Sequence, residues 1–127
     1  MKIGKSYRFE AAHDLPNHMG KCSRLHGHSY KVDITVTGQV NEEGEYSDSG
    51  MVVDFDILDQ AMHPIIEALD HYYLNDVLKE RTTAENVLWY IKENLETNLL
   101  QFEEAGGVVI SNIKLWETEK GYAEWNL

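Results

Sequence analysis

The sequence contains one cysteine, Cys22, two prolines and no long apolar run. A single cysteine cannot form a disulfide within the chain, which favours a reducing, cytoplasmic location. No segment reaches the ~18 consecutive apolar residues that a membrane-spanning helix needs, and no apolar core of a signal peptide follows Met1. We therefore expect a cytoplasmic protein without a membrane partner.

Positive charge is scarce as well. The chain has 11 lysines and arginines against 22 aspartates and glutamates, which gives a formal net charge of −11. Because proteins bind the phosphates of DNA and RNA mainly through Lys and Arg, we do not expect a nucleic-acid partner. One small anionic substrate would need only a few local cations, and Lys21 and Arg24 are candidates. The alternative is that both are solvated loop charges.

The apolar content is sufficient for one hydrophobic core. A length of 127 residues, 43% of them hydrophobic, predicts a single domain over residues 1–127. Alternation of apolar and polar residues predicts four strands. Their expected ranges are 2–13, about 26–40, 108–118 and 122–127.

Two helices are predicted between the second and third strands. Apolar residues at helical spacing follow Asp54, and Pro64 within that pattern predicts a kink or a break near His63. The second helix begins with a capping box, in which Thr82 is the N-cap and Glu85 lies three residues later, and it extends to about residue 101. Residues 70–76 between the helices resemble a turn.

The element order ββααββ predicts an α+β fold. Its simplest form is an antiparallel four-stranded sheet with two helices packed on one face. Such a sheet has two open edges, which favour oligomerisation. The alternative is a monomer whose edges are short and charged.

Three histidines lie in the apolar phase of their strands. His13 ends the first strand, and His26 and His28 begin the second. Residues two apart on a strand share a face and lie roughly 6.5–7 Å apart, so two such imidazoles can approach one metal ion. Three neutral histidines with one open position are typical of catalytic zinc. The alternative is that these are ordinary strand histidines.

Three further groups could carry chemistry. Cys22 lies beside two cations, which lower the pKa of a thiol and favour a thiolate base, although it could equally be an inert surface thiol. Asp70 could orient His71 as a proton shuttle, although a histidine at a helix C-terminus also interacts favourably with the helix dipole. Glu117 ends an apolar strand phase, where its carboxylate could accept two donors of a planar amino-heterocycle or remain a surface charge.

Four blocks of this sequence, taken in order, resemble one family. The 6-pyruvoyl-tetrahydropterin synthase / QueD family has motifs similar to Phe9–His13, Cys22–His28, Leu69–Asp76 and Trp116–Thr118. The three residues between the cysteine and the first His of the second block resemble its 6-carboxy-5,6,7,8-tetrahydropterin synthase (QueD) branch. The resemblance implies the tunnelling fold (T-fold), in which trimers close a twelve-stranded β-barrel. Two trimers commonly stack, which implies a homohexamer with active sites between subunits.

The resemblance also implies a lyase reaction. The substrate would be 7,8-dihydroneopterin triphosphate, and the products would be 6-carboxy-5,6,7,8-tetrahydropterin, acetaldehyde and triphosphate, on the route to queuosine. His13, His26 and His28 would hold Zn²⁺. The pyruvoyl product, or cleavage of a related pterin side chain, is the nearest alternative. A non-catalytic oligomeric protein that binds zinc or a pterin is an alternative of another class.

Roles for the remaining candidates follow from the same resemblance. Cys22 would be the general base, and His71, oriented by Asp70, would return protons. Glu117 would anchor the pterin and join the proton relay. Thr83 lies in a segment similar to one near the pterin pocket of the family. The candidates for the triphosphate are Lys21, Arg24 and Lys120.

Overall fold

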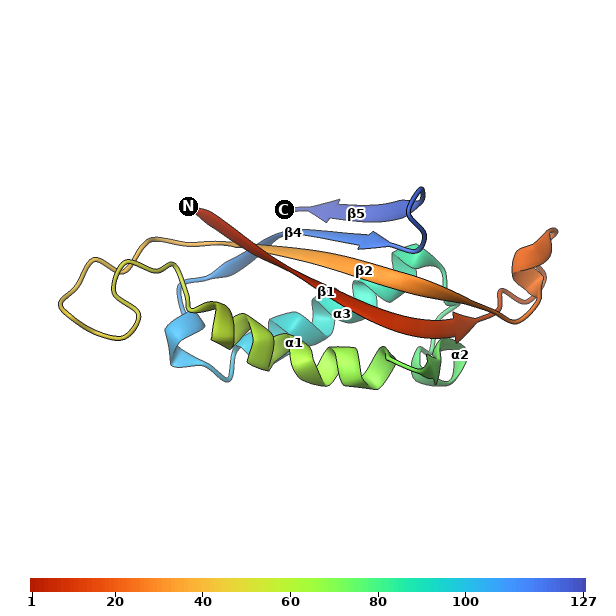
Figure 1. Ribbon diagram of the computed structural model, residues 1–127, viewed down its shortest axis with the longest axis horizontal. Coiled ribbons are helices and arrows are strands. Elements are labelled where there is room, and N and C mark those ends of the chain that lie inside the picture. Colours follow the sequence, from red (N-terminus) through yellow and green to blue (C-terminus); the bar gives the residue numbers. More distant parts are fainter.

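The computed structural model describes residues 1–127 as one twisted sheet with helices packed on one of its faces (Figure 1). The strand order is β3-β1-β2-β4-β5, and all neighbours are antiparallel except β3, which pairs with β1 in parallel. The strands are β1 (Lys2–His13), β2 (His26–Thr37), β3 (Tyr72–Tyr73), β4 (Val109–Trp116) and β5 (Tyr122–Asn126).

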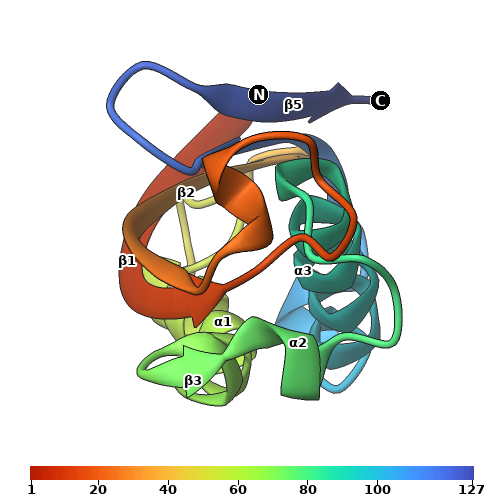
Figure 2. The same ribbon diagram turned by 90° about the vertical axis from the view of Figure 1, so that its right-hand side faces the viewer.

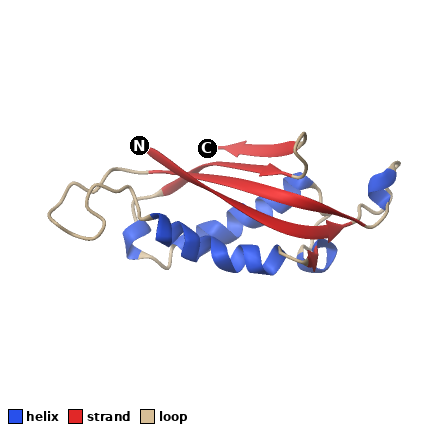
Figure 3. Cartoon of the chain, viewed as in Figure 1, coloured by secondary structure: helices blue, strands red, loops and turns tan.

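The helices cover only one face of the sheet (Figure 3). They are α1 (Phe55–Leu69), α2 (Leu74–Val77) and α3 (Ala84–Leu99), with short 3-10 turns η1 (Lys21–Ser23) and η2 (Glu103–Ala105). The apolar phases of the strands and the apolar stripes of α1 and α3 meet in one core, where each buried large side chain contributes about 1.5–3 kcal/mol. This core includes Phe9, Val32, Ile34, Ile113 and Leu115 from the sheet, and Leu58, Met62, Leu88, Ile91 and Leu95 from the helices.

The predicted α+β class and the helices on one face are confirmed, but the sheet has five strands rather than four. The segment predicted as a turn, residues 70–76, contains the strand β3 and most of α2. Sequence periodicity could not reveal β3, because a strand of two residues has no period. Its pairing with Ala11 and Ala12 of β1 is a tertiary contact.

A kink or a break was predicted near His63, and the break is wrong, because α1 is one continuous helix through Pro64. Pro64 lies on the exposed side of α1, whereas Met62 and Ile65 are buried and hold the helix against the sheet. Packing on one side therefore outweighs the loss of one backbone donor.

The N-cap of α3 is also one residue later than predicted. The hydroxyl of Thr83, not that of Thr82, accepts a hydrogen bond from the backbone N–H of Asn86 at 3.2 Å. Thr82 is instead fully buried. Two adjacent threonines both satisfy the sequence pattern, and only the packing of Thr82 distinguishes them.

The sheet of this chain remains open along β5 and along most of β1, so it does not close into a barrel by itself. Figure 2 looks along the sheet from the end at which β1 ends and β2 begins. The loop that carries η1 projects at this end, and α2 lies there as well. None of the helices has the length and apolarity that crossing a membrane requires.

Candidate metal centre and catalytic cleft

The three predicted histidines meet at this end of the sheet. His13 pairs directly with His26 across β1 and β2, while His28 lies opposite Ala11. The ring centroids are separated by 4.6 Å, 5.1 Å and 4.7 Å for the pairs 13–26, 13–28 and 26–28. One nitrogen from each ring lies within 4.8 Å of the other two. The cluster could therefore hold one metal ion.

Backbone carbonyls fix the tautomer of two of these rings. Nδ1 of His13 lies 2.8 Å from the carbonyl oxygen of Thr82, and Nδ1 of His26 lies 2.7 Å from that of Arg24. A carbonyl can only accept, so each Nδ1 carries the proton and donates. In the neutral ring each Nε2 then has a free lone pair, which is the arrangement of a metal-ligating histidine.

Two of the ring nitrogens have no partner in the protein. Nε2 of His13 and Nε2 of His28 are both buried and make no hydrogen bond. Burial also lowers the pKa of His28 more than the nearby Glu117 carboxylate raises it, which favours the neutral ring. Buried polar atoms are normally satisfied, so the donor set fits a cation that accepts these lone pairs.

Glu117 lies beside the cluster. Its carboxylate oxygens are 3.6 Å from Nε2 of His28 and 3.9 Å from Nε2 of His13. The residue directly follows β4, and its backbone N–H donates to the carbonyl of Gly121 at 3.0 Å, which fixes the turn. A carboxylate held here can accept donors from a molecule bound at the histidine cluster.

Asp70 and His71 are fixed to β1 by two hydrogen bonds. The N–H of Glu10 donates to Oδ1 of Asp70 at 2.8 Å, and the N–H of His71 donates to the carbonyl of Glu10 at 2.6 Å. The pKa of Asp70 is lowered by the Glu10 N–H and by the His71 imidazole, whose Nδ1 lies 3.0 Å from Oδ2. His71 has a positive φ of 62°, a strained conformation for a residue with a Cβ, which these contacts maintain.

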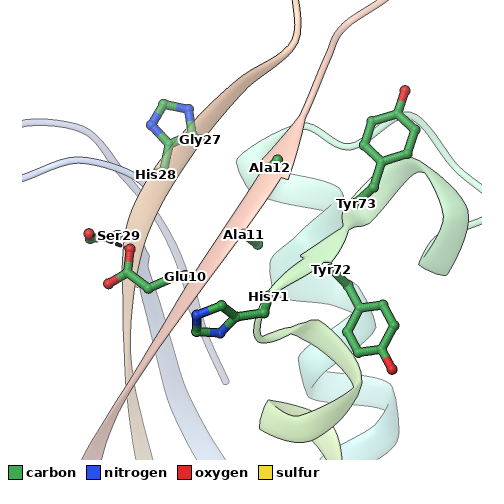
Figure 4. A pocket seen from close by; sticks show the side chains of 9 residues that line it. All are labelled: Glu10, Ala11, Ala12, Gly27, His28, Ser29, His71, Tyr72 and Tyr73. Atoms are coloured by element: carbon green, nitrogen blue, oxygen red, sulfur yellow. Dashed lines mark hydrogen bonds between the residues drawn. The ribbon is translucent and has the colours of Figure 1, made fainter.

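A cleft of about 460 Å³ separates the two groups of residues, with His28 on one side and His71 on the other. In Figure 4 the His71 imidazole points toward β1 beside Glu10, while Tyr73 projects away from it. The lining includes the small residues Ala12 and Gly27. A flat ring could therefore lie close to the backbone between the histidine cluster and the Asp70–His71 pair.

Cys22 is not brought to this cleft within one chain. It lies in η1, is partly exposed, and its thiol makes no hydrogen bond. The side chains of Lys21, Arg24 and Lys120 are exposed and form no ion pair, and Thr83 is occupied as the cap of α3. The single chain thus assembles the metal ligands with Glu117, and Asp70 with His71, but not the thiol.

Sequence reasoning missed two residues of the site. Thr82, which holds His13, was interpreted only as a helix cap. Tyr30 is fully buried with an unpartnered hydroxyl, and burial together with the Glu117 charge raises its pKa. The signal for Tyr30 was available, because it lies two residues after His28 in the same strand phase.

Comparison with known proteins places this geometry in a family. The family model described as 6-pyruvoyl tetrahydropterin synthase matches residues 2–126, almost the entire chain. The chain belongs to this family. Its members are lyases, so the predicted enzyme class and the resemblance drawn from four motifs are both confirmed.

Individual members of the 6-pyruvoyl tetrahydropterin synthase family agree with this assignment. The chain is 41% identical over 119 residues to the 6-carboxy-5,6,7,8-tetrahydropterin synthase of Synechocystis sp., covering 91% of this chain and 85% of the relative. It is 31% identical to the dihydroneopterin monophosphate aldolase of Pyrococcus furiosus, covering 92% and 91%. The solved 6-pyruvoyl tetrahydropterin synthase of Caenorhabditis elegans superposes with a TM-score of 0.82 at 24% identity, covering 100% and 95%, which confirms the T-fold.

Proposed function

We propose that this protein is a zinc-dependent 6-carboxy-5,6,7,8-tetrahydropterin synthase acting as one domain over residues 1–127. It converts 7,8-dihydroneopterin triphosphate to 6-carboxytetrahydropterin, acetaldehyde and triphosphate, on the route to queuosine. The observation that carries the proposal is the pair of buried Nε2 atoms of His13 and His28, which make no hydrogen bond, in a cluster whose His28 also lines a cleft together with His71. The similarity to the Synechocystis enzyme supports the choice of product.

His13, His26 and His28 hold the metal in this proposal. Three imidazole nitrogens and one open position favour zinc over magnesium or calcium, which prefer oxygen ligands. When bound, zinc polarises substrate oxygens and thereby acidifies the neighbouring C–H bonds. Thr82 and the carbonyl of Arg24 keep the ligating nitrogens free by accepting from the opposite side of each ring.

Proton transfer is assigned to Cys22 and His71. The Cys22 thiolate removes a proton from the substrate side chain. His71 presents Nε2 to the cleft, because its Nδ1 faces the Asp70 carboxylate at 3.0 Å and keeps that proton. Asp70 therefore acts by fixing the tautomer and orientation of His71.

Glu117 binds the heterocycle and joins the proton relay. Its two oxygens can accept two parallel N–H donors of an aminopyrimidine ring, which is the planar, bidentate pattern that a carboxylate recognises. Its position within 4 Å of His28 supports a role beside the metal ligands. Thr83, in contrast, is explained by its function as a helix cap, and we assign it no contact with substrate.

The complete site forms between subunits of a homohexamer. Two observations support this part of the proposal: the sheet of one chain has open edges, and the Cys22 thiol has no contact with the cleft residues of its own chain. A neighbouring copy would supply the thiol and cover an edge.

A second candidate function is cleavage of the side chain of a related dihydropterin without formation of the 6-carboxy product. The similarity to the Pyrococcus aldolase favours considering it. The same metal ligands, acid and base would serve both reactions. Formation of the 6-pyruvoyl product, in which triphosphate leaves and the three-carbon side chain stays on the ring, is the third outcome on this scaffold.

Product analysis distinguishes these reactions. Zinc-loaded protein is incubated with 7,8-dihydroneopterin triphosphate, and the products are identified by mass spectrometry with acetaldehyde trapped as a hydrazone. We expect 6-carboxytetrahydropterin and acetaldehyde in equal amounts. A pyruvoyl product, or a shortened dihydropterin, would assign the protein to one of the other two reactions. No turnover by a zinc-loaded oligomer would favour a binding protein.

The variant Cys22→Ala tests the assignment of the general base. It should lose turnover by at least about 100-fold while retaining its zinc, since general-base catalysis typically contributes 10²–10⁴-fold. Full activity of Cys22→Ala would contradict the assignment of the thiolate as base.

A further inference from the structure

The face of the sheet opposite the helices, called the helix-free face below, has a row of large side chains across four strands. The strand register places Arg8 opposite Lys31, Lys31 opposite Trp116, and Trp116 opposite Tyr122. All four belong to the phase that alternates with the buried core residues. Directly opposed residues have Cβ atoms about 4.5–5.5 Å apart, and two like charges in this relation repel.

This pair of cations is poorly neutralised by the protein. Arg8 forms no ion pair and no side-chain hydrogen bond, and the carboxylate nearest to Lys31 is that of Asp33 at 3.7 Å. The other lysine of this sheet region, Lys114, lies 3.8 Å from the Glu124 carboxylate and also contacts the rings of Trp116 and Tyr122. A chain with 22 acidic residues has ample carboxylates for pairing. An Arg8 without an ion pair, placed opposite a Lys31 that has only one long contact to Asp33, therefore points to an external anion.

This pair of cations borders a hollow of about 260 Å³ that is also lined by two residues with hydroxyl groups. Ser29 and Thr118 line it, although the Ser29 hydroxyl already donates to Oε2 of Glu10 at 2.6 Å. The Thr118 hydroxyl oxygen accepts from the N–H groups of Lys120 and Gly121, which leaves its proton free to donate. Glu119 is the one acidic residue of the lining, and it lies on the exposed turn between β4 and β5. The hollow therefore offers two cations and at least one free donor.

The hollow adjoins the catalytic cleft. Ser29 lines both, and the cleft lining continues from Ser29 to His28 and His71 (Figure 4). Residues two apart on one face of β2 are separated by roughly 6.5–7 Å, so Lys31 lies one such step beyond Ser29. A molecule whose ring lies in the cleft can thus extend a chain of phosphates along β2 to the cations.

We propose that this hollow binds the polyphosphate tail of the substrate. Arg8 engages two phosphate oxygens with its planar fork, Lys31 supplies a point charge, and Thr118 donates one hydrogen bond. The inference rests on the proposed function for the identity of the substrate, but the site itself requires only a linear polyphosphate. It replaces Lys21, Arg24 and Lys120 as the triphosphate-binding residues.

Binding of inorganic tripolyphosphate tests the site without catalysis. Calorimetric titration of the zinc-loaded protein should give a dissociation constant that rises about 10-fold or more in Arg8→Gln and in Lys31→Gln, and is partly restored in Arg8→Lys. Lys2→Gln is the matched control, because Lys2 lies on the same face at the far end of β1 and removes the same charge. Equal weakening by Lys2→Gln, or no binding to the wild type at millimolar concentration, would overturn the site.

Kinetics separate this proposal from the proposed function. With 7,8-dihydroneopterin triphosphate, Arg8→Gln should raise KM about 10-fold and change kcat less than about 3-fold, while affinity for unphosphorylated 7,8-dihydroneopterin stays the same. If the wild type turns over the substrate but KM is unchanged in Arg8→Gln and in Lys31→Gln, the polyphosphate site is overturned and the proposed function is retained. Absence of wild-type turnover, with tripolyphosphate binding still dependent on Arg8, would overturn the proposed function and retain the polyphosphate site.

Discussion

At the scale of single residues, the metal centre depends on which nitrogen of each imidazole is free. The carbonyls of Thr82 and Arg24 accept hydrogen bonds from the Nδ1–H groups of His13 and His26, so in both neutral rings the free lone pair is on Nε2. The buried Nε2 of His28 has no partner either. A cation would satisfy buried atoms that are otherwise left unpaired, at a cost of about 1–3 kcal/mol for each unsatisfied group.

Removal of one histidine should therefore remove the metal. In His13→Asn, zinc measured by plasma mass spectrometry should fall from about one ion per chain to below about 0.1, because two imidazoles do not form a closed or catalytic zinc site. The rise in melting temperature on adding zinc should disappear with it. His63→Asn is the control, since His63 is exposed and contacts only Glu67 at 3.0 Å. Full zinc content in His13→Asn would contradict the assigned ligand set.

The Asp70 carboxylate gives a second residue-scale prediction, in its pH dependence. Its pKa lies below the ordinary value of 3.8 because the Glu10 N–H and the His71 imidazole stabilise the ionised form. The stabilisation is therefore fully present above the unfolded pKa and is lost as the pH falls through the lower, folded pKa. In urea unfolding, the difference in free energy between wild type and Asp70→Asn should shrink below about pH 4.

A control variant isolates this effect. Asp48 hydrogen-bonds through its backbone carbonyl, which accepts from the N–H of Met51 at 3.1 Å, and not through its carboxylate. The difference in unfolding free energy between Asp48→Asn and the wild type should therefore not change over the same pH range. If the Asp70→Asn difference were constant from neutral to acidic pH, the contact between Asp70 and Glu10 would not stabilise the ionised form.

At the scale of elements, the start of α3 combines two adjacent threonines with different functions. Thr83 caps the helix by accepting from Asn86, and Thr82 turns inward to hold His13. The cap at Thr83 thus lies next to the residue that contacts His13, the proposed metal ligand. This arrangement explains why a threonine pair occurs here without assigning Thr83 to the substrate.

Replacement of Thr83 tests whether this residue acts only as the helix cap. Thr83→Ala should lower the free energy of unfolding by about 1 kcal/mol, whereas Thr83→Ser, which retains the hydroxyl, should differ from wild type by only a few tenths. Chemical denaturation measures both values. The kcat/KM of the folded Thr83→Ala protein should stay within about 3-fold of the wild type. A large loss of kcat/KM at unchanged stability would favour substrate binding by Thr83.

At the scale of the whole molecule, the sheet of the single chain has open edges, and the proposed function requires a thiol from a neighbouring copy. The cleft contains His28 and His71 but not the thiol. A barrel formed by several copies would close the edges of the sheet, since closure removes unpaired strand edges. Sedimentation should then give the mass of six chains of 14.6 kDa each.

Mixing two inactive variants tests shared sites. Cys22→Ala and His71→Ala should each be inactive, but subunits dissociated and reassembled at a ratio of 1:1 should recover about one quarter of the wild-type activity, because that fraction of interfaces has both residues intact. Each variant reassembled alone is the control. No recovery, with hexamers formed, would show that Cys22 and His71 act within one chain.

Much of the fold could be predicted from local patterns. Alternation over Lys2–His13 and helical spacing in α1 and α3 depend only on near neighbours, and both the strand and the helices are present. The local pattern gave a wrong prediction where the local structure depends on a contact between residues distant in sequence. Pro64 is accommodated because Met62 and Ile65 pack on the sheet, and β3 exists because Tyr72 pairs with Ala11.

The candidate site also has features that the sequence predicts and features that depend on tertiary contacts. The phase of His13, His26 and His28 along their strands was enough to expect a cluster, since side chains in one phase share a face. The tautomer of His13 depends on Thr82, which is 69 residues away in sequence, and the row that joins Arg8 to Lys31 depends on strand register. Spacing along a chain specifies which residues share a face. Only the packed structure brings distant groups within hydrogen-bonding distance, because that proximity is created by folding.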